Sequence, residues 1–313
     1  MTRREKAKLF GFVLVISQVI VAGVFWHNGR FVVRRLPVNL KGIPSYGLTL
    51  IGPPDPLFDE ATQTFFRGMP VARAKIFAIA PLAVFVNNKS GRVVVAYELR
   101  WDVGRPDGSV ESSSFAYTNP RALMDGGAPG EEAQGIQGLF SIKAGSMRLV
   151  SPAFSLAESD PIPSVADDDT IRELAHRVLA GASNITISLD GVFFDDGFFV
   201  GPDSIGFFAN FKAQIDANHD LLERLATSIR NNGGSPEPAF SEMAALIKRT
   251  DGPLSADATP TDYYRYHMAT YAKEILQARD KLGANAIIRL KLAMLRKPWV
   301  ALHKGGTPST KPR

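Results

Sequence analysis

The prevailing spacing of apolar residues in the body of the chain, residues 45–297, changes near residue 203. Before this position apolar residues tend to alternate with polar ones, which is typical of β-strands, and after it they recur every three or four residues, which is typical of amphipathic helices. Strands that precede the helices, instead of alternating with them, favour an α+β protein over one built from βαβ units. The chain has 313 residues, which is enough for roughly two domains.

The clearest strand is predicted for residues 92–103, where five apolar side chains share one face. They are Val93, Val95, Tyr97, Leu99 and Trp101. Further strands, separated by turn residues, are predicted at 75–86, 110–118, 142–154, 185–192 and 198–200. Short strands separated by turns are typical of an antiparallel β-sandwich, which we expect over residues 45–202.

One short helix is expected within this β-part, because apolar residues recur at helical spacing after the triplet Asp167, Asp168 and Asp169. The three carboxylates have two interpretations. They stabilise the N-terminal end of the helix through its dipole, or they bind a divalent cation. The first interpretation is preferred, because it explains the triplet without a metal.

A long amphipathic helix is predicted to begin at Asp203, a good N-cap residue, and to end at the Asn- and Gly-rich residues 231–234. About 28 residues make this helix ~42 Å long. Its apolar face carries a stripe consisting of Phe208, Phe211, Ile215, Asn218, Leu222, Leu225 and Ile229. A stripe of this length needs a partner helix, so these seven residues are also the candidate interaction surface, with Asn218 setting the register.

Helices able to cover the stripe are predicted downstream, at residues 240–248, 264–282 and 286–295. Gly283 separates the last two of them. We therefore expect an antiparallel helical hairpin or small bundle over residues 203–297, paired within the chain. Dimerisation through the stripe is the alternative.

Two segments carry a resemblance to a known class of domain. Residues 86–97, VNNKSGRVVVAY, followed by Trp101, resemble the central strand pair of immunoglobulin- or fibronectin-like domains in bacterial exported proteins. Residues 188–197, SLDGVFFDDG, followed by VGPD, are similar to a hairpin in uncharacterised bacterial exported or membrane-anchored proteins of this kind. The resemblance covers about 35 of 313 residues. It implies an immunoglobulin-like sandwich, without a disulfide because the chain has no Cys, and it carries no catalytic residue.

An uncharged apolar run of 18 residues begins at Leu9 and ends at Trp26, after four basic residues. As a helix it spans about 27 Å, close to the ~30 Å hydrocarbon core of a bilayer. We interpret it as an uncleaved signal anchor with the N-terminus in the cytoplasm and the body on the periplasmic or extracytoplasmic side. A signal peptide cleaved near Ala22 or Gly23 and a buried soluble helix are the alternatives.

The formal charge of +5 conceals an asymmetry. Residues 1–48 hold eight Lys and Arg against Glu5, residues 289–313 hold seven with no acid, and the body between them carries −9. A nucleic-acid-binding protein needs a basic surface that neutralises phosphates, so the acidic body argues against a nucleic-acid partner. The absence of Cys excludes thiol nucleophiles and Cys-bound metals.

The common sequence motifs of zinc proteases, nucleotide-binding loops, serine hydrolases and EF-hands are absent. We therefore predict no catalytic residue, no cofactor and no metal ligand. The nearest approach to a metal site is His219 with Asp216 and Glu223, at helical spacings of three and four. A solvated charged helix face predicts the same pattern and is the preferred interpretation.

Aromatic side chains cluster in the second half of the helical part, around His267. They are Tyr263, Tyr264, Tyr266 and Tyr271. Amphipathic rings suit a ligand groove, but core packing with hydroxyls that reach the surface is the simpler explanation.

These observations divide the chain into a membrane segment (1–29), a linker (30–44), a β-sandwich domain (45–202), a helical domain (203–297) and a basic disordered tail (298–313). The favoured hypothesis is a membrane-anchored, non-enzymatic envelope protein that binds a partner protein or acts as a scaffold, with a homodimer as one form of partner. The alternative is an exported hydrolase or glycan-binding protein that uses carboxylates such as Asp190, Asp195 and Asp196 at one end of the sandwich.

Overall fold

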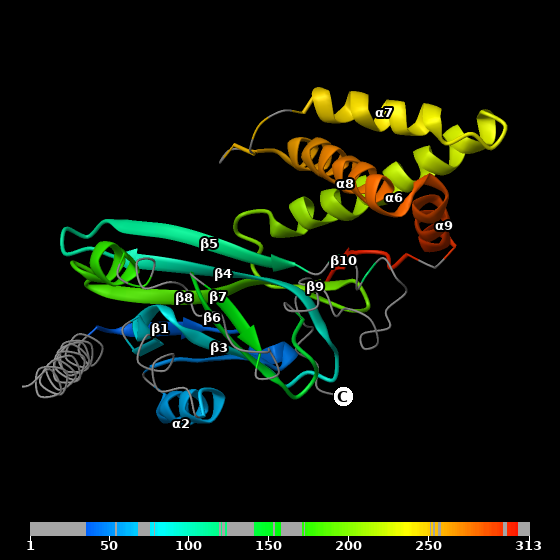
Figure 1. Cartoon of the computed structure of the whole chain (residues 1–313). Helices are drawn as coiled ribbons and strands as arrows, with labels where there is room; N and C mark the ends of the chain where they lie inside the picture. The colour runs from blue at the N-terminus through cyan, green and yellow to red at the C-terminus, as the bar shows by residue number, and fades with distance from the viewer. Residues whose placement is uncertain are drawn as a thin grey trace, which may run out of the picture. The chain divides into compact units, whose positions relative to one another are not determined.

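The computed structural model describes residues 36–305 except positions 54, 68–75, 78, 119, 121–122, 124–140, 153, 158–170, 172, 251, 253, 256–257 and 297–298. The chain is an α+β protein with two β-sheets and a group of long helices towards its C-terminal end, which confirms the predicted class (Figure 1). The run from Leu9 to Trp26 lies outside the described residues. No helix within the described part of the chain combines the length and hydropathy that crossing a bilayer requires.

The chain forms two compact units that are divided inside strands. Unit 1 comprises residues 1–90, 99–115 and 145–189, and unit 2 comprises residues 91–98, 116–144 and 190–313. The domain boundaries expected from the sequence stay predictions.

The smaller sheet belongs to unit 1 and is antiparallel throughout, in the order β2-β3-β6-β7. Its strands are β2 (Leu48–Ile51), β3 (Val84–Asn88), β6 (Met147–Ser151) and β7 (Phe154–Ala157). Helix α2 (Pro56–Phe65) packs against this sheet, because Phe58 of the helix lies in one apolar core with Phe85 and Leu149 (Figure 1). Asp55 begins the helix by accepting a hydrogen bond from the backbone N–H of Leu57 at 2.9 Å.

The larger sheet has six strands in the order β10-β9-β8-β4-β5, with β1 also paired to β8. The strands are β1 (Val38–Lys41), β4 (Val94–Gly104), β5 (Val110–Thr118), β8 (Asn184–Phe194), β9 (Phe198–Val200) and β10 (His303–Lys304). Two pairs are parallel: β1 with β8 and β10 with β9. The sheet is therefore mixed, whereas the sequence predicted antiparallel strands, and the immunoglobulin-like topology is not confirmed.

The strand predictions hold at β4 and β8, which are long, and also at β5 and β9. In residues 75–86 the strand begins only at Val84, because the 3-10 turn η2 (Ala80–Leu82) precedes it. Pro81 lies at the start of that turn, where its missing N–H costs no ladder hydrogen bond. The strand predicted at 142–154 is interrupted at Pro152, which separates β6 from β7.

Three short strands were not predicted. Strands β1 and β2 have four residues each and β10 has two, which is too short for a period to be read. Strand β10 lies within residues 298–313, which were predicted to be a disordered tail. The predicted helix near residue 171 is observed as a short π-helix, η4 (Leu174–Leu179), and its acidic triplet Asp167, Asp168 and Asp169 lies outside the described residues.

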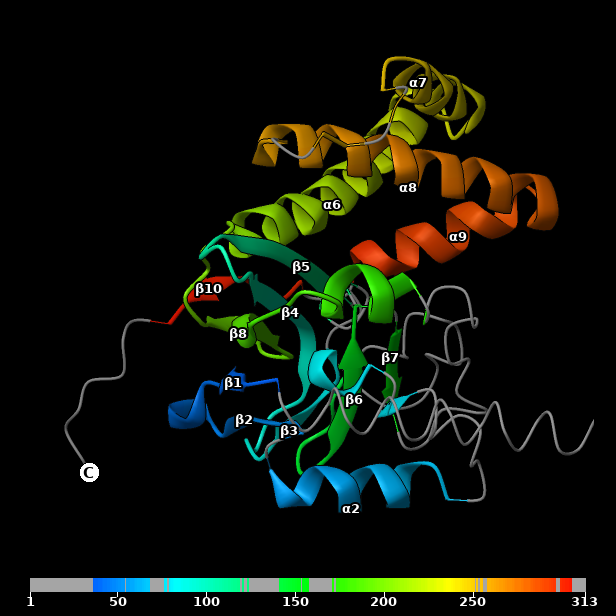
Figure 2. The ribbon, with the colours of Figure 1, turned by 90° about the vertical axis from the view of Figure 1, so that its left-hand side faces the viewer.

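Four helices of unit 2 pack together around one apolar core (Figures 1 and 2). They are α6 (Phe207–Asn231), α7 (Glu237–Lys248), α8 (Pro260–Leu282) and α9 (Ala284–Leu295). The caps follow the sequence: Thr259 and Asp262 form a capping box at the start of α8, and Gly283 separates α8 from α9 with a φ of 83°. The helical part is thus a small bundle.

The start of α6 is held by a residue that lies outside the helix. Asp203 is not the N-cap itself, which is Gly206, but its Oδ1 accepts the backbone N–H of Phe208 at 2.9 Å. Its other oxygen pairs with the ammonium group of Lys304 on β10. The prediction that Asp203 is the N-cap is therefore wrong by three residues, although its carboxylate still accepts a backbone N–H of the first turn. The same carboxylate ties the C-terminal strand to the start of the helix.

Candidate functional site

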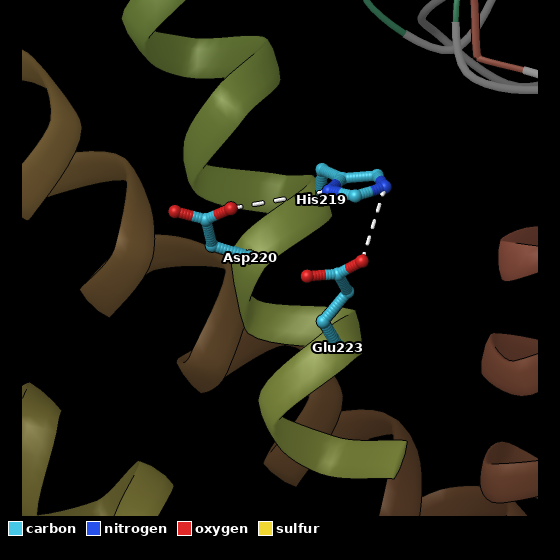
Figure 3. Close-up of side chains that lie close together, drawn as sticks. All are labelled: His219, Asp220 and Glu223. Carbon is cyan, nitrogen blue, oxygen red and sulfur yellow. Dashed lines mark ion pairs between the residues drawn. The ribbon is translucent and has the colours of Figure 1, made fainter. Parts of the chain in front are cut away.

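The side chains of His219, Asp220 and Glu223 lie close together on one exposed part of α6 (Figure 3). Nδ1 of His219 is 3.9 Å from Oδ1 of Asp220, and its Nε2 is 3.8 Å from Oε1 of Glu223. The cluster forms because positions four apart in an α-helix are neighbours on its surface, and because the adjacent Asp220 turns its carboxylate towards the ring. One ligand atom from each of the three residues lies within 4.8 Å of the other two.

The trio differs by one residue from the one considered on sequence. Asp216 forms an ion pair with Lys212, its neighbour one turn earlier, at 2.5 Å. Asp220 lies in the cluster in its place. Spacing alone does not decide between the two carboxylates, because both are within one turn of His219, and the nearby lysine decides it.

Asp220 is positioned by a helix that lies far away in the sequence. The hydroxyl of Tyr264 on α8 donates a hydrogen bond to Oδ2 of Asp220 at 2.6 Å. Partial burial, together with this bond to an anionic acceptor, raises the pKa of Tyr264 to about 12, so the phenol stays protonated at neutral pH. This arrangement uses Oδ2 for the hydrogen bond while Oδ1 faces His219.

His219 is in turn packed against an indole. The ring of Trp299 meets the imidazole edge to face, with 4.6 Å between the centroids. Asp220 and Trp299 were not predicted as members of this site. The only signal for Asp220 was its place beside His219, and only a correct pairing of α6 with the later segments would have found Tyr264 and Trp299.

The predicted interaction stripe is mostly covered by the chain's own residues. Phe211, Ile215, Asn218, Leu222 and Leu225 are buried, and each is at most 7% exposed, whereas Phe208 and Ile229 are half-buried. The first part of the stripe lies in a core with Phe193 and Phe199, and the second part lies in the core of the four helices. A partner molecule would have to displace other parts of unit 2 to reach the stripe.

The predicted tyrosine cluster is partly assembled around His267. Three rings lie near the imidazole, with centroids at 6.3 Å for Tyr263, 5.3 Å for Tyr266 and 5.9 Å for Tyr271. Burial lowers the pKa of His267 to about 4, because the apolar surroundings disfavour the charged imidazolium. Tyr264 points elsewhere and bonds to Asp220. This cluster therefore packs helix α8 with a neutral histidine at its centre.

Two of the three carboxylates of the alternative hypothesis, those of Asp190 and Asp196, have structural partners. Asp190 is 3% exposed, and its two oxygens accept hydrogen bonds from the backbone N–H and the hydroxyl of Ser204, at 2.8 and 2.7 Å. Asp196 pairs with Arg92 at 3.0 Å and accepts the backbone N–H of Phe198 at 3.1 Å. Asp195 lies half-buried in the turn between β8 and β9. These contacts stabilise a hairpin and the segment that leads into α6.

A surface groove lies between α6 and α7, with a cavity volume of about 210 Å³. Its floor is apolar and contains Leu221, Leu225, Ala239, Met243 and Leu246. Arg224, Glu242 and Arg249 line its rim and are exposed. Glu242 accepts a hydrogen bond from the buried Ser228 at 3.2 Å, whereas neither arginine forms an ion pair with any of the described residues. The groove thus combines an apolar floor with a rim that carries two positive charges and one negative charge.

Comparison of the chain with protein-family models, with curated proteins and with solved structures found no match.

Proposed function

We propose that this chain is a membrane-anchored, non-enzymatic binding module of a bacterial envelope. In this proposal the apolar run from Leu9 to Trp26 is the anchor, and the body lies on the periplasmic or extracytoplasmic side. The helices of unit 2 bind a segment of a partner protein. The proposal rests on one observation above the others: the groove between α6 and α7 has an apolar floor and a charged rim.

The chemistry of the groove favours a protein segment over a small molecule. Its volume of about 210 Å³ is below the ~300 to 1,000 Å³ of most small-ligand pockets, so it suits one or two inserted side chains. An apolar centre with a polar rim is the usual composition of a protein interface. Arg224 and Arg249 favour an acidic partner, so we infer a segment with an apolar side chain next to a carboxylate.

We further infer an immunoglobulin-like sandwich for the β-part, from a single buried tryptophan. Trp101 on β4 is completely buried and donates its indole N–H to the carbonyl of Leu82, just before β3, at 3.0 Å. A buried tryptophan that links the two sheets is a feature of such domains. The parallel pairing of β1 with β8 and the order of the larger sheet depart from the common pattern.

The anchor predicts the mass and location of the mature protein. Full-length protein in the membrane fraction, with an intact N-terminus and a body open to external protease, is the expected result. Mass spectrometry of the purified product and protease treatment of intact cells measure these properties. A product that is cut near Ala22 or Gly23 and recovered in the soluble fraction would show that the chain is exported and free.

The groove predicts a site-specific crosslink in native membranes. A photoreactive residue in place of Ala245, which is exposed in the groove, is expected to give an adduct of one defined mass, and the same residue in place of the exposed Lys273 on α8 is not. Reversing the charge with Arg224→Glu is expected to lower the yield of the adduct at least tenfold, because the new carboxylate repels an acidic partner. A tenfold change corresponds to about 1.4 kcal/mol. Lys273→Glu is the matched control. Equal adducts from both positions, or an adduct that survives Arg224→Glu, would contradict the assignment.

The hydrolase alternative receives no comparable support, because Asp190 and Asp196 are engaged in the contacts that hold the β8–β9 hairpin and its exit.

A further inference from the structure

We propose that His219, Asp220 and Glu223 form a surface site for a divalent transition-metal ion, with Zn²⁺ as the ion that the ligand set fits best. The site goes beyond the proposed binding function and does not depend on it. It offers one imidazole nitrogen and two carboxylate oxygens on one turn of α6 (Figure 3). A fourth position stays open to water.

The distances suit a small ion after minor side-chain rotation. Zinc binds nitrogen and carboxylate oxygen at about 2.0 to 2.2 Å, so two of its ligand atoms are normally less than ~4.4 Å apart. The separation of 3.8 Å between Nε2 of His219 and Oε1 of Glu223 falls within that range. Asp220 needs the larger adjustment, because its Oδ1 lies 3.9 Å from the other ring nitrogen, Nδ1, and one ion binds a single nitrogen of the ring.

Within the part of the chain that the structure describes, no lysine or arginine forms an ion pair with the cluster. Among the described residues, Asp216 is neutralised by Lys212, whereas Asp220 and Glu223 form no ion pair with any lysine or arginine. Arg224 lines a shallow depression with both carboxylates but makes no ion pair with either. Two carboxylates beside an imidazole therefore leave net negative charge, which favours a bound cation.

Residues outside the cluster hold two of the ligands in place. The hydroxyl of Tyr264 occupies Oδ2 of Asp220, which leaves Oδ1 on the side of His219, and Trp299 packs against the imidazole ring. Hydrogen bonds from such supporting residues orient metal ligands in known sites. The nitrogen ligand favours zinc over calcium or magnesium, because those ions prefer oxygen ligands only.

The direct test is a calorimetric titration of the metal-free, full-length chain in detergent with Zn²⁺ alone, near neutral pH and without an affinity tag. Saturable binding of one equivalent is expected. His219→Ala and Glu223→Gln are each expected to weaken binding at least about tenfold, and Tyr264→Phe about tenfold through loss of support to Asp220. Asp216→Asn is the matched control, because it removes a carboxylate one turn away that is already paired to Lys212, and it is expected to leave binding unchanged.

A second readout locates the ion. Cu²⁺ bound at His219 is expected to quench the fluorescence of Trp299, whose ring centroid is 4.6 Å from the imidazole, and Trp299→Phe identifies the quenched fraction. His219→Ala is expected to abolish this quenching. If circular dichroism shows that His219→Ala is unfolded, the exposed Glu223→Gln decides the result. The absence of saturable binding below about 1 mM Zn²⁺, or binding that neither ligand variant weakens, would overturn the proposal.

Discussion

Replacement of Phe193 by alanine is expected to lower the free energy of unfolding of unit 2 by about 3 to 5 kcal/mol, the usual range for a buried phenylalanine. Phe193 lies on β8 and has no exposed surface. Its ring meets Phe199 at a centroid distance of 4.8 Å and Phe211 on α6 at 4.7 Å. The rings of Phe207 and Phe208 also contact it, with centroids 5.7 and 5.5 Å from that of Phe193.

Phe193→Ala lowers the free energy of unfolding because the Phe193 ring packs β8 against α6. Removing it leaves a cavity between β8 and the first two turns of α6, and rigid aromatic neighbours do not collapse to fill it. The lost ring contacts come in addition to the lost burial. Urea unfolding of the full-length chain, followed by hydrogen exchange of the α6 amides, measures the change.

Leu290→Ala is the matched control, since it also removes an apolar side chain from unit 2 but from a position that is 55% exposed on α9. Its effect is expected to stay within about 0.5 kcal/mol. If Phe193→Ala costs no more than this control, the core described around Phe193 is wrong.

Lowering the pH from 7 to 4 is expected to destabilise the helices of unit 2 by about 3 kcal/mol through His267 alone. Burial lowers the pKa of His267 from 6.5 to about 4 in the folded chain. In the unfolded chain the imidazole therefore takes up a proton first, as the pH falls below about 6.5. Protons favour the unfolded state until the pH reaches the folded pKa, so the stability is fully present above pH 6.5 and is lost progressively towards pH 4.

The comparison of His267 with His267→Gln isolates this contribution. Glutamine does not titrate, so the variant is expected to lose the steep fall in stability between pH 6.5 and 4, whatever its stability at neutral pH. The difference between the two unfolding curves as a function of pH is the measurement. Parallel curves would mean that His267 takes up its proton at the same pH in the folded and the unfolded chain, and that its surroundings are more polar than the described residues indicate.

The stripe of α6 illustrates how far the sequence predicts the candidate site. Periodicity placed the stripe on one helix and identified Leu222 and Leu225 as buried, because an apolar side chain at helical spacing has to be covered whatever covers it. The same reasoning placed His219 on the polar side. It did not select Asp220 over Asp216, because that choice depends on which side chains from elsewhere, Lys212 and Tyr264, reach each carboxylate.

The strands likewise differ in how far the sequence predicted them. Long alternating runs such as β4 and β8 were predicted because alternation is a local property of the backbone. The parallel pairing of β1 with β8 joins Val38 to Ile185, and no local pattern in a four-residue strand encodes a partner so far along the chain. The short strand β10 is likewise ordered by pairing with β9 and by the contact of Lys304 with Asp203.

By itself, the sequence determined the α+β class, the positions of the strongly alternating strands and the four helices near the C-terminus, because each follows from hydrogen bonding and side-chain periodicity within a short segment. The tertiary structure alone decided the order of the strands in each sheet, the cover of the α6 stripe and the composition of the cluster at His219. These features depend on contacts between residues far apart in the chain, such as Tyr264 with Asp220 and Trp299 with His219, and the free energy of those contacts exists only once the chain has folded.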